Sequence, residues 1–424
     1  MWAACLLAAA LAAVQPAERL AEISVHGNLL TSDAEVIRLA EVSVGMPFSD
    51  ALTDVVANRL RATKRFQKVE VLKRFASISD LSQVMLVIVV DEGPVQIEPA
   101  EDGTEAHAVR KGGGRLMFLP ILDYEEGYSV SYGVRLAVPD VIGKARLSFP
   151  LTWGGQKRAA AEIEQPLSGP IFTRVQAGGG ISERENPYFE IDDTRTGGWG
   201  RVERAFGRYL RAGGTAGLDR VSFGEGTDRM TRAGGDVVLD TRLDPFLARD
   251  AVYARASLER LWFRNALPQP DRNPAAPSGF DAANRTEFDA RWYAGLPAQM
   301  VAVVRGLRED SNRPLPAYLM PILGGTANLR GFPADTAVGD TLVGTSVELR
   351  VPLSSPLSIG KFGVNTFFDA ATVYPKGERL ADQDFRRGFG AGVWFSAAVV
   401  RLNLSVAHGV GASTRIHLAA AFAF

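Results

Sequence analysis

The 424-residue chain contains one cysteine and four histidines. Cys5 lies in an apolar N-terminal segment, so the rest of the sequence offers no thiol for a disulfide or a thiolate metal site. The histidines are scattered without metal-ligand spacing: His26, His107, His408 and His417. No Gly-x-Ser-x-Gly element or pair of candidate catalytic carboxylates stands out. We therefore predict no enzyme, no cofactor and no metal.

The chain also lacks a charge excess and a long apolar segment. Its 47 Lys and Arg residues nearly cancel its 48 Asp and Glu residues, which removes the global electrostatic argument for a nucleic-acid partner. Beyond the N-terminus the longest apolar run, Val84 to Val90, has only the length of a strand. If the protein spans a membrane, it must therefore do so with strands.

The N-terminal segment, Met1 to Ala17, is rich in Leu and Ala and ends near Pro16. Ala10 and Ala12 are small residues of the kind that signal peptidase accepts. We predict a secretory signal peptide at residues 1–17, although neither Lys nor Arg precedes the apolar stretch. An N-terminal helix of a soluble protein is the alternative.

Residues 20–93 combine helical and strand patterns in the order β-α-α-β-β. Ser32 followed by Glu35 is a capping box that predicts a helix to about Ala40, and a second amphipathic helix follows Ser49. Strands are predicted at Ile23 to Val25, Val69 to Arg74 and Val84 to Asp91. These elements predict a small α+β domain, and the Pro- and Gly-containing residues 94–114 predict a linker.

From residue 115 to 424, alternation with period two replaces the helical pattern. Sixteen such segments start near residues 115, 126, 143, 156, 171, 194, 208, 229, 250, 284, 299, 342, 359, 386, 399 and 413. Short connections alternate with long polar ones, as in an outer-membrane barrel with both termini in the periplasm. Hydrocarbon leaves no backbone group unpaired, so a span built of strands must close. We predict a mainly β fold, a 16-stranded antiparallel transmembrane barrel; a soluble sandwich or an eight-bladed repeat protein is the alternative.

Two patterns locate a candidate site inside this barrel. Alternation over Gly363 to Ala371 turns Phe367 and Asp369 towards the lumen and Phe368 towards lipid. The long connection before residue 342 holds Arg330, and if this connection folds into the lumen, the guanidinium would need a carboxylate such as Asp369 or Glu348. The glycines from Gly388 to Gly392 lie within a strand, which indicates close packing and not a phosphate cradle.

The chain resembles the BamA/TamA-like superfamily for outer-membrane protein assembly and translocation. Residues 22–93 are similar to its polypeptide-transport-associated (POTRA) domain, in Ile23 to Asn28 and Arg65 to Val71. Asp240 to Phe246 resembles a periplasmic turn of the family, and Ser346 to Pro352 resembles a barrel strand. A further motif resembles the tip of the family's inward-folded sixth extracellular loop, and its main residues are Gly324, Gly325, Leu329, Arg330, Gly331 and Phe332.

The resemblance implies a site and partners. Arg330 would pair with Asp369 of the motif Phe367-Phe368-Asp369 on the inner wall, and Phe422 and Phe424 would form the C-terminal signal read by the assembly machinery. The protein would lie in the bacterial outer membrane with its POTRA domain in the periplasm. There it would help fold β-barrel proteins into the membrane or move polypeptides across it. Its partners would be the lipid bilayer and unfolded outer-membrane or secreted polypeptides, with accessory periplasmic lipoproteins left open.

Physical reasoning adds a place where such a client could bind. The first strand, near Arg115 to Tyr124, must meet the last strand, Ser413 to Phe424, and a weak seam there could accept a client strand. Two alternatives stay open: a two-partner secretion-type transporter of one dedicated client, and a passive diffusion porin. The porin would leave residues 22–93 and the Arg330 loop without a purpose.

Overall fold

The computed structural model describes residues 18–28, 31–66, 68–76, 80, 82–92, 96–98, 108–110, 116–242, 248–264, 282–353, 361–397 and 400–422. The predicted signal peptide, His107 and Phe424 lie outside these residues, and so does much of the predicted linker. The chain divides into two compact units, Met1–Lys111 and Gly112–Phe424. None of the described helices has both the length and the apolar character needed to cross a membrane.

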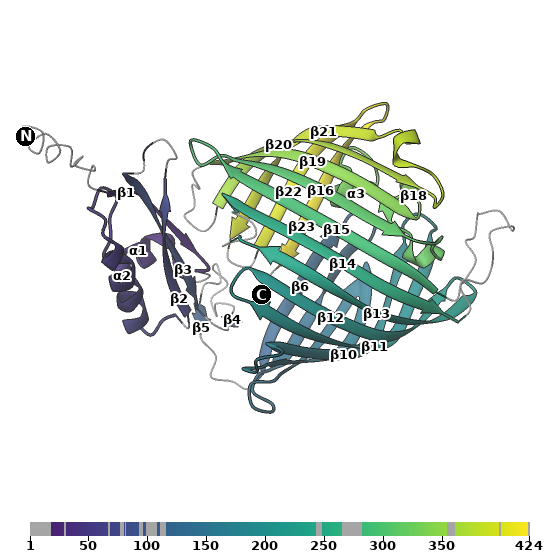
Figure 1. The fold of residues 1–424 in the computed structure, drawn as a ribbon, viewed down its shortest axis with the longest axis horizontal. Coiled ribbons are helices and arrows are strands. Elements are labelled where there is room, and N and C mark those ends of the chain that lie inside the picture. Colours follow the sequence, from purple (N-terminus) through teal and green to yellow (C-terminus); the bar gives the residue numbers. More distant parts are fainter. Residues whose placement is uncertain are drawn as a thin grey trace, which may run out of the picture. The chain divides into compact units, whose positions relative to one another are not determined.

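The second unit is a closed barrel of sixteen strands, which confirms the predicted fold class (Figure 1). Every strand pairs antiparallel with its neighbours in sequence order, and the last one meets the first, so the sandwich and repeat alternatives are wrong. All sixteen strands begin within three residues of their predicted starts. They are β6 (Met117–Glu125), β7 (Ser129–Val138), β8 (Arg146–Gly154), β9 (Gln156–Pro166), β10 (Arg174–Asn186), β11 (Ile191–Phe206), β12 (Leu210–Phe223), β13 (Gly226–Asp240), β14 (Ala251–Phe263), β15 (Ala282–Gly295), β16 (Val301–Ser311), β19 (Thr341–Leu353), β20 (Lys361–Tyr374), β21 (Arg386–Ala397), β22 (Val400–Gly409) and β23 (Thr414–Phe422).

Burial follows the predicted alternation along the barrel wall. On β20, Asn365, Phe367 and Asp369 are buried inside, while Phe368 is 45% exposed on the outer face. The longest connection, residues 312–340, carries short elements of its own: η1 (Ala317–Leu319), β17 (Ile322–Leu323), α3 (Gly325–Asn328) and β18 (Ala337–Val338). A further turn, η2 (Leu380–Asp382), lies between β20 and β21.

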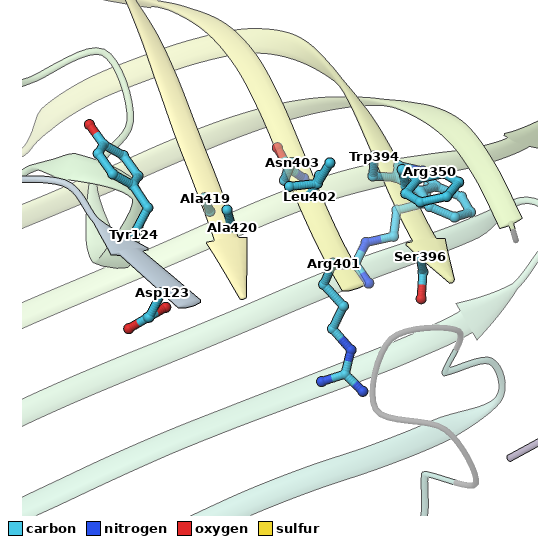
Figure 2. A pocket seen from close by; sticks show the side chains of 11 residues that line it. Asp123, Tyr124, Arg350, Trp394, Ser396, Arg401, Leu402, Asn403, Ala419 and Ala420 are labelled. Atoms are coloured by element: carbon cyan, nitrogen blue, oxygen red, sulfur yellow. The ribbon is translucent and has the colours of Figure 1, made fainter. Parts of the chain in front are cut away.

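The junction of β23 and β6, here called the seam, is the shortest pairing in the wall. Among the described residues, two pairs join these strands, Ala420 with Tyr124 and Ala421 with Asp123. Both pairs lie near the C-terminal ends of two antiparallel strands, so most of each strand extends beyond the end of the other. Figure 2 shows Ala420 near the end of β23, beside Asp123 and Tyr124 on β6. By contrast, β22 pairs with β23 from Val400 to His408.

The N-terminal unit contains a three-stranded sheet in the order β1-β3-β2 and two helices. The strand β1 (Arg19–His26) runs parallel to β3 (Gln83–Asp91), and β2 (Lys68–Phe75) runs antiparallel to it. Helix α1 (Asp33–Ala40) begins after Ser32, whose Oγ accepts the Glu35 N–H at 3.3 Å. The Glu35 carboxylate binds Arg38 and so does not complete the predicted capping box.

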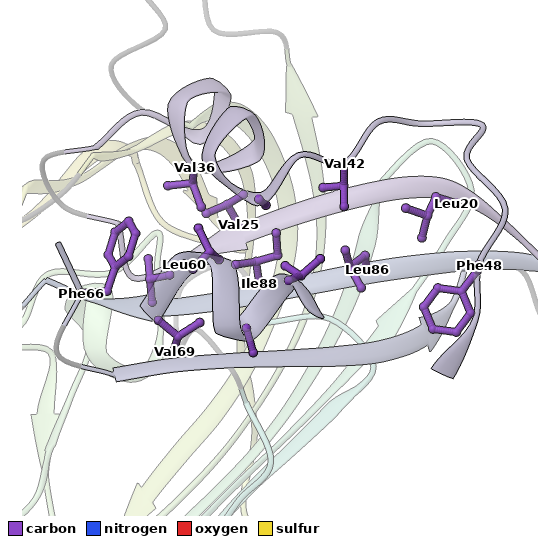
Figure 3. Packing of buried hydrophobic residues seen from close by; sticks show 14 of the residues in the cluster. Leu20, Val25, Val36, Val42, Phe48, Leu60, Phe66, Val69, Leu86 and Ile88 are labelled. Atoms are coloured by element: carbon purple, nitrogen blue, oxygen red, sulfur yellow. The ribbon is translucent and has the colours of Figure 1, made fainter. Parts of the chain in front are cut away.

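The apolar faces of these elements form one core (Figure 3). Val36 on α1, Leu60 on α2 (Asp50–Ala62) and Leu86 and Ile88 on β3 are fully buried in it. The β-α-α-β-β order is therefore the predicted one. Beyond it, β4 (Gln96–Glu98) and β5 (Ala108–Arg110) pair within the residues that were predicted as linker.

Leu60→Ala should destabilise the N-terminal unit by about 2–5 kcal/mol, because it removes a fully buried side chain from a packed core. Val55→Ala on the same helix, where the side chain is 43% exposed, should change the stability by less than about 0.5 kcal/mol. Urea unfolding of the full chain, followed by its helical circular dichroism, measures the difference. Equal midpoints for the two variants would contradict this packing.

Candidate functional site: the lid loop and the seam

The connection between β16 and β19, residues 312–340, is called the lid loop below. Its first half is fastened to one sector of the barrel wall. The Tyr318 hydroxyl donates to Asp228 of β13 at 2.8 Å, and Arg195 of β11 donates to the Tyr318 carbonyl at 2.8 Å. Apolar side chains around Tyr318 complete this anchor, among them Val221, Phe223, Leu261, Leu315 and Met320.

The second half of the lid loop places Arg330 against another sector, formed by β19 and β20. Its Nε and Nη2 donate to the two oxygens of Asp369 at 2.7 and 2.8 Å, and its Nη1 donates to Glu348 at 2.9 Å. The guanidinium also lies over the Phe367 ring, 3.4 Å from its centroid. One cation thus meets two carboxylates, Asp369, which is buried, and Glu348, whose side chain is 11% exposed. The structure brings together the four side chains that the sequence analysis grouped.

Backbone fit at the tip depends on glycine. Gly388 of β21 and Gly409 of β22 are paired in register, and the lid tip lies directly on them. A Cβ on Gly388 would stand 1.9 Å from the Arg330 carbonyl oxygen, and one on Gly409 would stand 2.8 Å from the Phe332 ring. Gly331 has φ +93°, which favours glycine, and its own Cβ would meet the backbone of Gly409 at 2.7 Å.

The remaining residues of the predicted motif lie nearby. Gly324 and Gly325 both have positive φ and start the turn that leads to the tip. Leu329 is fully buried, and Phe332 is nearly so. Phe422 is the last residue of β23, but its side chain and the whole of Phe424 lie outside the described residues.

Sequence reasoning missed a second connection to the tip. The Gly331 N–H donates to His417 Nε2 at 2.8 Å, and His417 Nδ1 lies within hydrogen-bonding distance of Glu126 Oε2. A backbone N–H can only donate, so Nε2 must carry the lone pair and Nδ1 the proton that faces Glu126. His417 belongs to β23, and Glu126 follows β6 in the next turn. The buried imidazole therefore joins both sides of the seam to the lid loop.

The same contacts bear on enzymatic chemistry. His417 pairs in register with Ser405, but Gly331 and Glu126 occupy its two ring nitrogens, so neither is free to activate a hydroxyl. His408 contacts Thr414 through Nδ1. Within the described part of the chain, no three His, Cys, Asp or Glu side chains form a group able to hold a metal ion.

A cavity of about 230 Å³ opens at the seam, next to Ala419 and Ala420 of β23. Figure 2 shows Asp123 and Tyr124 of β6 on one side and Arg401, Leu402 and Asn403 of β22 on the other, with the end of β23 between them. The buried indole N–H of Trp394 in its lining has no hydrogen-bond partner among the described residues. The seam therefore combines unpaired strand edges with a partly apolar, partly cationic hollow.

Comparisons with known proteins agree with this geometry. A family model described as the Omp85 superfamily domain matches residues 207–417. The chain is similar to the crystal structure of BamA from Haemophilus ducreyi lacking POTRA domains 1–3, with a TM-score of 0.59 and 14% identity over 95% of this chain and 84% of that one. It is also similar to CdiB from Escherichia coli, with a TM-score of 0.51 and 12% identity over 98% and 92% of the two chains. No curated protein sequence matches the chain. At these identities the likeness establishes the fold.

Arg330→Ala should destabilise the barrel by about 3–5 kcal/mol, because Asp369 and Glu348 would keep buried charges without their cation. The temperature at which the purified protein loses its compact, heat-modifiable gel mobility measures this loss. Arg308→Ala is the control, since this side chain is 51% exposed beside Asp310 and its loss should cost less than about 1 kcal/mol. An equal loss for both variants would contradict a special role for the Arg330 pair.

His417→Ala should expose the tip of the lid loop, because the Gly331 N–H loses its acceptor. Hydrogen exchange of the Gly331 amide is the direct measurement, and it should become faster by at least about tenfold. His417→Gln should restore most of the protection, since its side-chain oxygen can accept the same bond. His408→Ala should leave the exchange unchanged. Unaltered exchange in His417→Ala would show that this bond does not hold the tip.

Proposed function

Because the chain belongs to the Omp85 superfamily, we propose that it is an assembly factor that helps β-barrel proteins fold into the outer membrane. Members of this superfamily are non-enzymatic outer-membrane barrels, and their POTRA domains lie in the periplasm. Their clients are polypeptides. The finer role proposed here depends on one observation, the two-residue overlap of β23 and β6 at the seam.

The short seam leaves strand edges without a partner. In hydrocarbon an unpaired backbone N–H or C=O group costs several kcal/mol, so each such edge favours any segment that can pair with it. On β6, residues before Asp123 lie outside the ladder with β23 among the described residues. An incoming client strand could form these hydrogen bonds before it enters the lipid. The seam would then serve as a template for strand addition.

The contacts of the lid loop favour a gated assembly factor over a passive channel. It is held by Asp228 and Arg195 in one sector of the wall and by Asp369, Glu348 and His417 in another. A chain segment fastened at both places crosses the lumen. The tip also contacts both sides of the seam. Displacing the lid loop and separating β6 from β23 would therefore break some of the same contacts.

The N-terminal sheet offers an earlier contact for a client. Part of the outer edge of β1 is used by main-chain bonds between Leu20 and the segment Gly45 to Met46. The opposite edge strand, β2 (Lys68–Phe75), pairs only with β3 among the described residues. An extended client segment could add to β2 by main-chain hydrogen bonds, which depend on the extended backbone of the client more than on its side chains. This would suit a factor with many clients.

A disulfide across the seam should stop assembly. Tyr124→Cys with Ala420→Cys replaces two residues that are direct partners across the seam. The Cα atoms of such antiparallel partners are about 4.5–5.5 Å apart, a separation that a disulfide can span. The matched control, Leu402→Cys with Ala420→Cys, shares one cysteine but links β22 to β23 inside a continuous ladder. Both variants carry Cys5→Ser and are produced in the host after depletion of its own copy. Folded outer-membrane barrels are then quantified by heat-modifiable gel mobility.

We expect cells with the oxidised seam variant to lose many kinds of folded barrel, and cells with the control variant to keep them. A reductant should restore folded barrels in cells with the seam variant. Normal barrel levels with the seam closed would refute the proposed mechanism. If depletion instead removes a single exported protein and leaves the barrels unchanged, the protein is a dedicated transporter. Rapid, size-limited flux of small sugars into liposomes would indicate a porin.

A further inference from the structure

Three arginines lie side by side on the barrel wall at one rim. Arg220 of β12 pairs in register with Arg229 of β13, and the N–H of Arg264, which directly follows β14, donates to the Arg229 carbonyl at 3.1 Å. Neighbouring strands are about 4.8 Å apart, so the three side chains leave the sheet as one row. All three residues are exposed.

This row faces away from the lumen. On the same face, two residues before Arg220 and Arg264, Leu218 is 64% exposed and Trp262 is 41% exposed. The alternate positions, Val221 and Leu261, are buried inside. Along β12 the outward residues below Arg220 are all apolar or small: Leu210, Ala212, Gly214, Ala216 and Leu218. On β12 the arginine row therefore marks the end of the apolar band, where lipid headgroups begin. On β14 a further outward residue, Arg260, is polar and donates to Asn284 of β15.

The row lies in the outer leaflet. The POTRA domain of the superfamily is periplasmic, so β6 starts at the periplasmic rim. Antiparallel alternation from β6 makes β12 and β14 end at the extracellular rim, and β13 starts there. The three arginines consequently stand at the level of the outer headgroups.

These arginines lack the partners that inner-wall arginines have. Inside the barrel, many arginines are paired with carboxylates, as in Arg201 with Asp236 and Arg291 with Asp289. The side chains of Arg220, Arg229 and Arg264 make no ion pair or hydrogen bond with any residue that the structure describes. Like charges directly opposite each other on a sheet are destabilising. A bound anion would therefore stabilise the row by reducing this repulsion.

A hollow of about 570 Å³ lies beneath the row. Its lining includes the three arginines together with the apolar or weakly polar residues Leu218, Thr231 and Trp262. We propose that this hollow binds an outer-leaflet lipid whose headgroup carries phosphate. The guanidinium forks of Arg220, Arg229 and Arg264 would hold phosphate oxygens, and an acyl chain would lie over Leu218 and Trp262. This site is independent of the seam and of the proposed assembly function.

Native mass spectrometry of the full chain in detergent tests the proposal, with diphosphorylated lipid A as the probe. Arg220→Gln with Arg229→Gln should weaken binding by about tenfold or more, because each arginine near an anionic headgroup adds to the affinity. The control, Arg204→Gln with Arg208→Gln, removes two arginines near the opposite rim, one at the end of β11 and one in the turn that follows, and should leave binding unchanged. Heat-modifiable mobility shows that each variant is folded. Arg264→Gln alone, expected to weaken binding about threefold, provides the same test if the double variant does not fold.

Phosphatidylcholine, which has acyl chains but no net negative charge, should bind at least about tenfold more weakly than the probe, and inorganic phosphate should not displace the probe. Equal loss of binding in the rim variant and in its control would overturn the proposal, because it would indicate general charge attraction. Displacement by inorganic phosphate would also overturn it, since the acyl chain would then contribute nothing. Unchanged binding after removal of Arg220 and Arg229 would place the lipid elsewhere.

Discussion

Closure of the sheet is the constraint on which the rest of this structure depends. A wall of strands in hydrocarbon must pair its backbone groups, and fourteen of the sixteen junctions do so with continuous ladders, while the β8–β9 ladder is interrupted at Phe149 and Pro150. The remaining junction pairs Ala420 and Ala421 with Tyr124 and Asp123 and no further described residues. Its short overlap follows from where two antiparallel strands end. Contacts inside the barrel compensate near this junction, because Glu126, His417 and the lid tip lie against each other there.

Arginines on the inner and outer faces of the barrel wall differ in whether the protein supplies a carboxylate partner. Inside, where burial would make an isolated ion costly, Arg330 has Asp369 and Glu348, and Arg305 has Asp289 and the Ala327 carbonyl of the lid loop. These bonds hold the lid loop against the inner wall. Outside, Arg220, Arg229 and Arg264 lie together near the extracellular rim, and none of the described residues supplies a counter-charge to them. The paired arginines inside the barrel hold the protein's own lid loop. The arginine row outside favours binding of an anionic molecule from the membrane.

Local patterns in the sequence predict much of this architecture. Alternation with period two gave the sixteen strands and turned Asp369 inwards, because the face of a residue depends only on its neighbours along the strand. The Arg330 contacts could be anticipated once a carboxylate on the inner wall was known. The seam overlap, the Glu126–His417 contact and the arginine row could not, since each depends on register between strands far apart or on separate chain segments. Pairing of β4 with β5 was missed because each strand has only three residues.

The docked lid tip also sets an order of events during folding. Its partners come from β19 to β23 and from the turn after β6, and Glu126 and His417 are 291 residues apart in the sequence. Contacts between such distant segments form late, because the entropy of closing the intervening chain is lost before any bond is gained. Arg330 can bind its carboxylates once β20 is in place, but Gly331 must wait for the last strand. Docking of the tip therefore coincides with completion of the barrel, and a newly made copy of this protein remains an open-edged sheet until that moment.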